Sequence, residues 1–276
     1  MEKSANKILA IVLVGFLAFF CLYLLFLPGF EPSFEKAPAL HFTMLLYALL
    51  SVLALTAIDR KRLRAKHWLA ACGLGLLSIA VFLPREGDTL NFHLLGLTPF
   101  TVVTANLLIG VTVALVFLLV LSLASDHDIE KTLIRPFTVK NVLIYFGILC
   151  AFVLVYWALT KFRAPGAITL LDIPGCIGAG VSEEVILRLL PFAFALFLGG
   201  GKSGSKPLTF LLMTIPFTLL HFFDEFLFAG FIATLPALIQ FWIVAAVPMT
   251  LLFWKRDLFT AISVHVLWDV LATLFA

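Results

Sequence analysis

About nine long apolar runs, separated by short polar or charged segments, make up most of the chain. Most of them approach the roughly 20 residues with which an α-helix crosses the hydrocarbon layer of a bilayer. The pattern therefore predicts an all-α, polytopic membrane protein of about eight to nine transmembrane helices. The predicted spans are residues 8–28, 38–58, 67–84, 98–124, 139–160, 168–199, 207–223, 229–254 and 257–275.

Composition supports the bilayer as the solvent for most of the chain. Of the 276 residues, 62% are hydrophobic and only 13% are charged, with a mean hydropathy of +1.12. A soluble core does not need so much apolar surface. The net charge of +3 is spread over short loops and forms no basic patch, so we expect a lipid bilayer and no nucleic acid as partner.

The charges of the connecting loops alternate along the chain and predict the topology, because basic loops are retained in the cytoplasm. The N-terminal run ends at Pro28 and Gly29 without a small-x-small cleavage pattern, so it is interpreted as a retained first span. We expect a multi-pass protein of the cell membrane, with the N-terminus in the cytoplasm and the C-terminus outside. Only the fifth loop, with Lys161 and Arg163, departs from the alternation. The basic loops carry Lys3, Lys7, Arg60, Lys61, Arg62, Arg64, Lys66, Lys131, Arg135, Lys202, Lys206, Lys255 and Arg256, and the acidic loops carry Glu31, Glu35, Glu86, Asp88, Asp224 and Glu225.

We divide this one continuous membrane domain into two parts by their chemistry. Residues 139–276 contain every candidate chemical group, whereas residues 1–138 are expected to be transmembrane scaffold helices. An ionisable side chain inside a bilayer is costly and is expected to face a partner or a wet cavity. The residues of this kind inside the predicted spans are Glu183, Glu184, Arg188, His221, His265 and Asp269.

The sixth predicted span contains an EExxxR arrangement. Glu184 and Arg188 are four residues apart, so on a helix they share one face and neutralise each other. Glu183 lies about 100° around the helix and lacks that partner, which makes it a candidate general base. Taken alone, the three residues are equally compatible with an inert charge-neutral cluster that holds helices together.

Two further motifs pair residues four apart. Phe217 and His221 share one face of the seventh span, and His265 and Asp269 share one face of the ninth. Each histidine taken alone is compatible with a purely structural role. If the three helices pack around one intramembrane cavity, however, the groups meet there as a base, a second imidazole and hydrogen-bonding groups for an oxyanion, which is what amide hydrolysis requires.

In order and helical placement, these three motifs resemble those of the CPBP family of intramembrane proteases, the CAAX proteases and bacteriocin-processing enzymes that include the Ras-converting CAAX endopeptidase. The resemblance implies a helical fold that encloses a cavity in the membrane. It also implies that Glu183 and His221 activate a water, that Glu184 and Arg188 organise the site, and that His265 and Asp269 lie on the oxyanion side.

Two positions depart from the family pattern. Asp269 stands where Asn is common, and since an ionised carboxylate repels an oxyanion, it must be protonated, orient His265 or bind a cation. Leu189 stands where many members have glycine. Glutamate with two histidines is also an acceptable zinc ligand set, but HExxH is absent, so no metal is expected to be required and zinc stays an alternative.

These motifs favour an intramembrane endopeptidase that cleaves a membrane-associated or lipid-modified substrate. A non-catalytic scaffold or bacteriocin-immunity-type protein with the same fold is the alternative. A proton-coupled carrier is disfavoured, because no broken-helix inverted repeat is evident. Since the loop charges place His221 and Asp269 in the outer half of the membrane, we expect an exported or membrane-anchored peptide as substrate rather than a CAAX protein.

Overall fold

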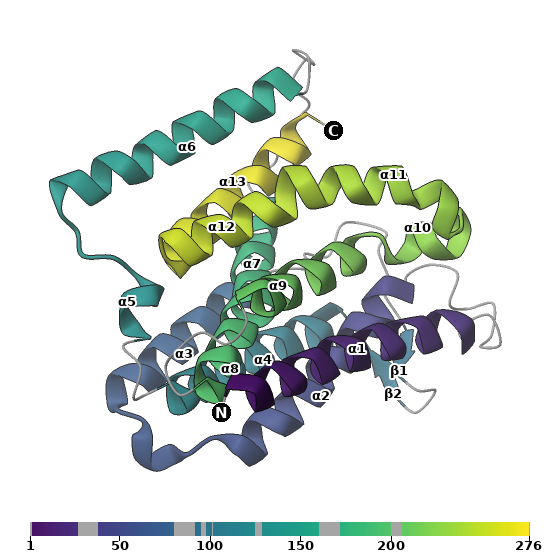
Figure 1. Ribbon diagram of the computed structural model, residues 1–276, viewed down its shortest axis with the longest axis horizontal. Helices are drawn as coiled ribbons and strands as arrows, with labels where there is room; N and C mark the ends of the chain where they lie inside the picture. The colour runs from purple at the N-terminus through teal and green to yellow at the C-terminus, as the bar shows by residue number, and fades with distance from the viewer. Residues whose placement is uncertain are drawn as a thin grey trace.

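The fold is helical apart from one short β-hairpin (Figure 1). The computed structural model describes residues 2–26, 38–79, 92–94, 98–100, 102–124, 129–159, 172–199 and 206–275. The elements are α1 (Glu2–Phe26), α2 (Pro38–Ala57), η3 (Arg60–Arg62), α3 (Ala65–Ser78), β1 (Phe92–Leu94), β2 (Thr98–Phe100), α4 (Val102–Leu123), α5 (Glu130–Leu133), α6 (Val139–Leu159), α7 (Asp172–Glu183), η4 (Glu184–Leu189), α8 (Leu190–Leu198), α9 (Lys206–His221), α10 (Phe223–Phe228), α11 (Phe231–Phe241), η5 (Trp242–Ala246), α12 (Val247–Lys255) and α13 (Leu258–Leu274).

Each of the predicted spans overlaps a helix, so the helical class is confirmed. The fourth span was predicted from residue 98, but its helix begins at Val102 because β2 pairs with β1 in an antiparallel hairpin. Pro99 explains the difference in part, since a proline pushes the residue before it toward an extended backbone. The all-α class holds, and within the described residues this short hairpin is a local departure from it.

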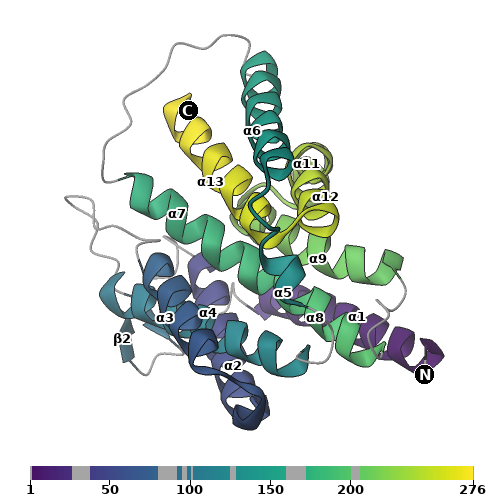
Figure 2. The same cartoon turned by 90° about the vertical axis from the view of Figure 1, so that its left-hand side faces the viewer.

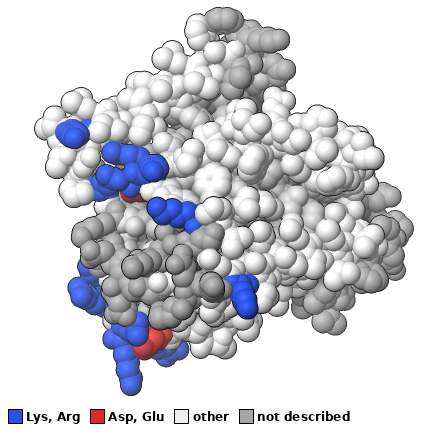
Figure 3. All heavy atoms as spheres, viewed as in Figure 1, with Lys and Arg blue, Asp and Glu red and all other residues white. Residues whose placement is uncertain are grey.

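The chain is a polytopic membrane protein. Within the described residues, four helical stretches are long and apolar enough to cross a membrane, namely Ser4–Leu25, Val103–Leu123, Val139–Ala158 and Phe231–Lys255. Large apolar side chains also cover the surface of these helices. Figure 3 shows that the visible lysine and arginine side chains gather toward one end of the molecule. The acidic loop residues Glu31, Glu35, Glu86 and Asp88 lie outside the described residues.

The continuous helix formed by α7, η4 and α8 lies between two groups of helices (Figure 2). On one side it packs against α3 and α4, and α2 packs on α4. On the other side it packs against α9 and α13, and α6 packs on the outer face of α13. The main apolar core joins these groups, since it includes Met44, Val113, Val185 and Phe253 from four different helices. The central helix is thereby held from both sides at the point where it carries its charged residues.

Two turns of π-helix, η4 and η5, interrupt the helices around this point, and each is followed by a proline. Leu190 N–H donates to Val185 O and Val247 N–H donates to Trp242 O, which are both five-residue spacings. Pro191 and Pro248 come directly after these donors. Because a proline ring clashes with the carbonyl four residues earlier, a wider turn before it relieves the contact. The prolines therefore account for the π-turn that carries Glu184 and Arg188.

A glycine lets α7 and α13 approach closely. A Cβ added to Gly180 would lie 2.7 Å from Val266 Cγ2 and 3.3 Å from Val266 N. The backbone of α13 thus packs directly on α7, one residue beyond His265 and a few residues before Glu184. This close contact fixes the spacing between the two helices at the candidate site.

Candidate active site

The structure brings the predicted site residues together from three helical segments. Glu183 ends α7, and Glu184 and Arg188 lie in the π-turn η4 that continues it. His221 is the last residue of α9, and His265 lies in the middle of α13. The convergence that the motifs required is therefore observed.

Glu184 is the centre of a buried network. Its Oε1 atom lies 2.5 Å from Arg188 Nη1 and 2.8 Å from His265 Nδ1, and both charged side chains are fully buried. Because a carboxylate oxygen only accepts, the His265 Nδ1 atom must carry the proton of this bond. Glu184 thus neutralises Arg188 and, at the same time, ties the central helix to α13.

Arg188 is held on its remaining sides as well. Its Nε atom lies 3.4 Å from Thr250 Oγ1, and its Nη2 atom lies 3.9 Å from Met249 Sδ. The guanidinium carbon lies 4.0 Å from the centroid of the Phe217 ring, in a cation–π contact. The guanidinium is therefore fixed by α9 and α12 in addition to its own helix.

The Glu183 carboxylate lies between the two imidazoles. Its Oε2 atom is 3.6 Å from His221 Nε2 and 3.6 Å from His265 Nε2. This oxygen is enclosed, and among the described residues no donor lies within hydrogen-bond distance of it. The Glu183 side chain as a whole is 22% exposed, in contrast to the fully buried Glu184. A buried acceptor without a partner, beside the partly exposed side chains of His221 and Asp269, is unusual and suits a group that acts on a small ligand.

The His221 ring is oriented by the end of its own helix. Its Nδ1 atom lies 2.8 Å from the carbonyl oxygen of Phe217, one of the carbonyls that the last turn of a helix leaves without a backbone donor. A carbonyl only accepts, so Nδ1 carries the proton and Nε2 is left to face Glu183. The ring is also packed between Phe217 at 4.4 Å and Phe241 at 4.9 Å, measured between centroids.

The His265 ring is more enclosed than that of His221, with a side-chain exposure of 3% against 32%. Its Nε2 atom faces two carboxylates, Glu183 at 3.6 Å and Asp269 Oδ2 at 3.7 Å. The sequence placed Asp269 on the same helix face as this imidazole, with orientation of His265 as one of its possible roles, and the carboxylate closest to His265 is that of Glu184. Asp269 lies at ion-pair distance and beyond hydrogen-bond distance, and its side chain is 27% exposed.

Metal binding was an open alternative for this cluster. Within the described part of the chain, no group of three or more His, Cys, Asp or Glu side chains is arranged to hold a metal ion. That hydrolysis needs no metal stays a prediction.

Three residues of the site were not expected from the sequence. Thr250 and Met249 contact Arg188, and the Phe241 ring packs at a tilt against the His221 ring. A lone threonine, methionine or phenylalanine in an apolar span carries no distinguishing pattern. The only available signal was Pro248, which predicts a distortion of the helix beside Met249.

Comparison with known proteins agrees with the motifs. Residues 165–271 match the family Rce1-like, described as type II CAAX prenyl endopeptidase Rce1-like. This segment includes every predicted site residue from Glu183 to Asp269, so the resemblance to the CAAX-protease family is confirmed over this part of the chain. No curated protein and no solved structure matches the chain.

Proposed function

We propose that the protein is an intramembrane endopeptidase of the CAAX-protease type, in which Glu183 and His221 activate a water that attacks a peptide bond. The observation that carries the proposal is the 3.6 Å separation of Glu183 Oε2 from His221 Nε2, with the proton of the imidazole placed on Nδ1. The match of residues 165–271 to a CAAX prenyl endopeptidase family supports the reaction class.

The geometry gives both groups the same hydrogen-bonding character. An ionised Glu183 accepts, and a neutral His221 with its proton on Nδ1 also accepts at Nε2, so the two cannot bond to each other. One water molecule between them donates a hydrogen to each, which is the expected bridge for polar atoms more than 3.5 Å apart. Its oxygen lone pair is then free to attack a carbonyl carbon, and Glu183 receives the proton as general base.

The opposite side of the cluster suits the developing oxyanion. His265 already donates from Nδ1 to Glu184, and a second proton on Nε2 would face Glu183 and Asp269. In that protonated form the imidazole supplies a positive donor for the oxyanion. Glu184 and Arg188 do not contact the substrate in this mechanism and act by positioning His265.

The depth of the site follows from helix lengths. Lys206 begins α9, and His221 ends it, roughly 22 Å further along the helix axis. On α13 the His265 Cα lies roughly 12 Å from the Asp257 cap. We therefore propose that the reaction takes place inside the bilayer, away from the surface that the basic residues predict to be cytoplasmic. The substrate would then be a peptide anchored in or presented to the outer half of the membrane.

Cleavage in cells tests the assignment. Wild-type protein, Glu183→Gln and the matched control Glu225→Gln are expressed at equal levels, and new N-termini of membrane proteins are identified by N-terminal labelling. Glu225 is exposed on α10, so its variant carries the same chemical change outside the site. We expect termini that depend on wild-type protein, persist with Glu225→Gln and disappear with Glu183→Gln.

Two other arms complete this experiment. Identical termini from wild-type protein and Glu183→Gln would overturn the role of Glu183, and the absence of any wild-type-dependent terminus would favour the non-catalytic scaffold. The prediction that hydrolysis needs no metal is tested with the purified enzyme. Its activity on a peptide that contains an identified cleavage site is measured with and without a zinc chelator. Loss of activity with the chelator and its recovery with added zinc would contradict it.

A further inference from the structure

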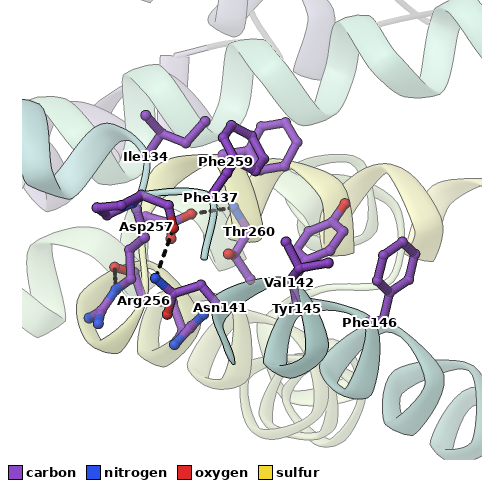
Figure 4. Close-up of a pocket in the computed structure, with 12 residues that line it drawn as sticks. Ile134, Phe137, Asn141, Val142, Tyr145, Phe146, Arg256, Asp257, Phe259 and Thr260 are labelled. Atoms are coloured by element: carbon purple, nitrogen blue, oxygen red, sulfur yellow. Dashed lines mark hydrogen bonds between the residues drawn. The ribbon is translucent and has the colours of Figure 1, made fainter. Parts of the chain in front are cut away.

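Arg256, just before the start of α13, has a buried nitrogen without a hydrogen-bond partner among the described residues, and it lies beside a small cavity. This cavity has a volume of about 200 Å³ and lies between the segment 134–138, the first turns of α6 and the corner between α12 and α13 (Figure 4). It is lined by Ile134, Arg135, Pro136, Phe137, Asn141, Val142, Tyr145, Phe146, Arg256, Asp257, Phe259 and Thr260. None of these residues belongs to the candidate active site.

One end of the cavity is polar and carries an available positive charge. The Nε atom of Arg256 is buried, and among the described residues it has no hydrogen-bond partner. The neighbouring cation, Arg135, is already used, because it donates to the carbonyl oxygens of Lys255 at 2.6 Å and Arg256 at 3.0 Å. Asp257 accepts from Thr260 N at 2.7 Å as the cap of α13. Of the two arginines that line this cavity, Arg256 is thus the one with a buried N–H that no described residue accepts.

The other end of the cavity is apolar. Val142, Tyr145 and Phe146 follow one another along α6, and Phe259 faces them from α13 (Figure 4). The rings of Tyr145 and Phe259 stack with centroids 5.6 Å apart. The side chains of Phe146 and Phe259 remain substantially exposed. This surface suits a hydrocarbon chain that lies along α6.

The surroundings select a negatively charged ligand. The cavity lies at the end of the molecule where lysine and arginine side chains gather (Figure 3). A larger cavity of about 480 Å³ shares residues 134–137 and adds Lys66 to its lining. Basic pockets between transmembrane helices on the cytoplasmic side are the setting in which acidic lipid headgroups bind. The cation suits the phosphate of such a headgroup, and the adjoining apolar surface suits the acyl chain attached to it.

We propose that this cavity binds an acidic phospholipid, with its phosphate on Arg256 and one acyl chain between α6 and α13. The proposal is independent of the proteolytic function. Such a lipid would contact both α6 and the connection between α12 and α13. It would thereby strengthen the packing of α6, which lies mainly against α13.

Lipid binding to the purified protein in detergent tests the proposal. Native mass spectrometry measures the affinity for dioleoylphosphatidylglycerol and for dioleoylphosphatidylcholine. Arg256→Gln is compared with Lys255→Gln, which removes the same charge from the adjacent residue outside the cavity. We expect tighter binding of phosphatidylglycerol, a loss of about tenfold in Arg256→Gln, as for a charged hydrogen bond, and little change in Lys255→Gln.

A second pair of variants tests the acyl channel without altering charge. Val142→Trp fills the cavity, whereas Leu143→Trp places the same ring on the exposed side of α6. We expect only Val142→Trp to weaken lipid binding. Equal losses in Arg256→Gln and Lys255→Gln, equal binding of both lipids, or full competition by inorganic phosphate at millimolar concentration would overturn the proposal. Thermal melting of each variant identifies any that fails to fold. If a variant of one pair does not fold, the other pair of variants tests the proposal.

Discussion

Glu184 holds His265 through a direct hydrogen bond of 2.8 Å between Oε1 and Nδ1, although the two residues lie 81 positions apart in the chain. The same oxygen accepts from Arg188. One buried atom therefore links the charge balance of the central helix to the orientation of an imidazole on α13. The second glutamate of the EExxxR motif is, on this account, a positioning residue for His265.

The first prediction concerns this buried pair. Glu184→Gln leaves Arg188 buried without its counter-charge, and breaking one partner of a buried pair costs about 3–5 kcal/mol. We expect a large fall in the thermal unfolding midpoint in detergent. The double variant Glu184→Gln/Arg188→Met removes both charges and should recover much of that stability without recovering cleavage.

The exposed pair of Asp59 and Arg62, with a separation of 3.3 Å, is the matched control. Arg62→Gln should change stability by less than about 1 kcal/mol, because an exposed ion pair is weak. If the double variant is no more stable than Glu184→Gln, the pair is not the source of the instability.

The second prediction concerns the acid at the end of the last motif. Asp269 lies 3.7 Å from His265 Nε2 and is partly exposed, so its charge is not required for packing. We expect Asp269→Asn to fold normally and to retain activity within about tenfold of the wild type, because an amide keeps a polar contact with the site. Asp269→Ala should lose about 10²-fold or more in kcat, the scale of a lost polar contact on the oxyanion side. Equal kcat values for the two variants would contradict this role.

Gly180 provides a test of the contact between α7 and α13. Gly180→Ala places a methyl group against Val266 and forces the helices apart, at a cost of about 1–3 kcal/mol for overpacking. His265 then moves away from Glu184. The fall in kcat should therefore be larger than the loss of folded protein accounts for. Gly147 on α6 has nothing within 4 Å of an added Cβ, so Gly147→Ala should leave both quantities unchanged or slightly raise stability. A normal kcat in Gly180→Ala would show that this close contact does not determine the position of His265 relative to Glu184.

The Phe217 ring contacts three of the ionisable residues of the site. It lies under Arg188 at 4.0 Å, beside His221 at 4.4 Å and edge-on to His265 at 5.6 Å. Phe217→Leu keeps most of the apolar volume but removes the cation–π contact, worth up to about 2 kcal/mol when desolvated. Phe253→Leu makes the same change at an equally buried ring outside the site. We expect similar losses of thermal stability but a loss of cleavage only in Phe217→Leu, and equal activity would refute a specific role for the ring.

Much of the fold could be predicted from the sequence because the bilayer imposes one simple rule. A span must be apolar and helical, so runs such as 139–160 and 257–275 identify α6 and α13 nearly to the residue. The same rule made Glu183, His221 and His265 conspicuous, since ionisable groups are rare in such runs. Their convergence could be expected because each needs a partner inside the membrane.

The details of that convergence could not be predicted. Spacing along one helix paired His265 with Asp269, whereas the closer carboxylate, Glu184, comes from a different helix. The packing of α7 on α13, which is close at Gly180, is tertiary and cannot be read from spacing along one helix. The β-hairpin before α4 and the π-turns also depend on local backbone geometry, which an apolar pattern does not encode.

The most direct test of the account is a structure of the protein in lipid at a resolution that shows ordered water. We predict a water oxygen within about 2.6–3.2 Å of both Glu183 Oε2 and His221 Nε2, with Glu184 still bound to His265. A direct hydrogen bond between Glu183 and His221 with no water in reach, or a metal ion coordinated by both, would contradict the proposed activation of water.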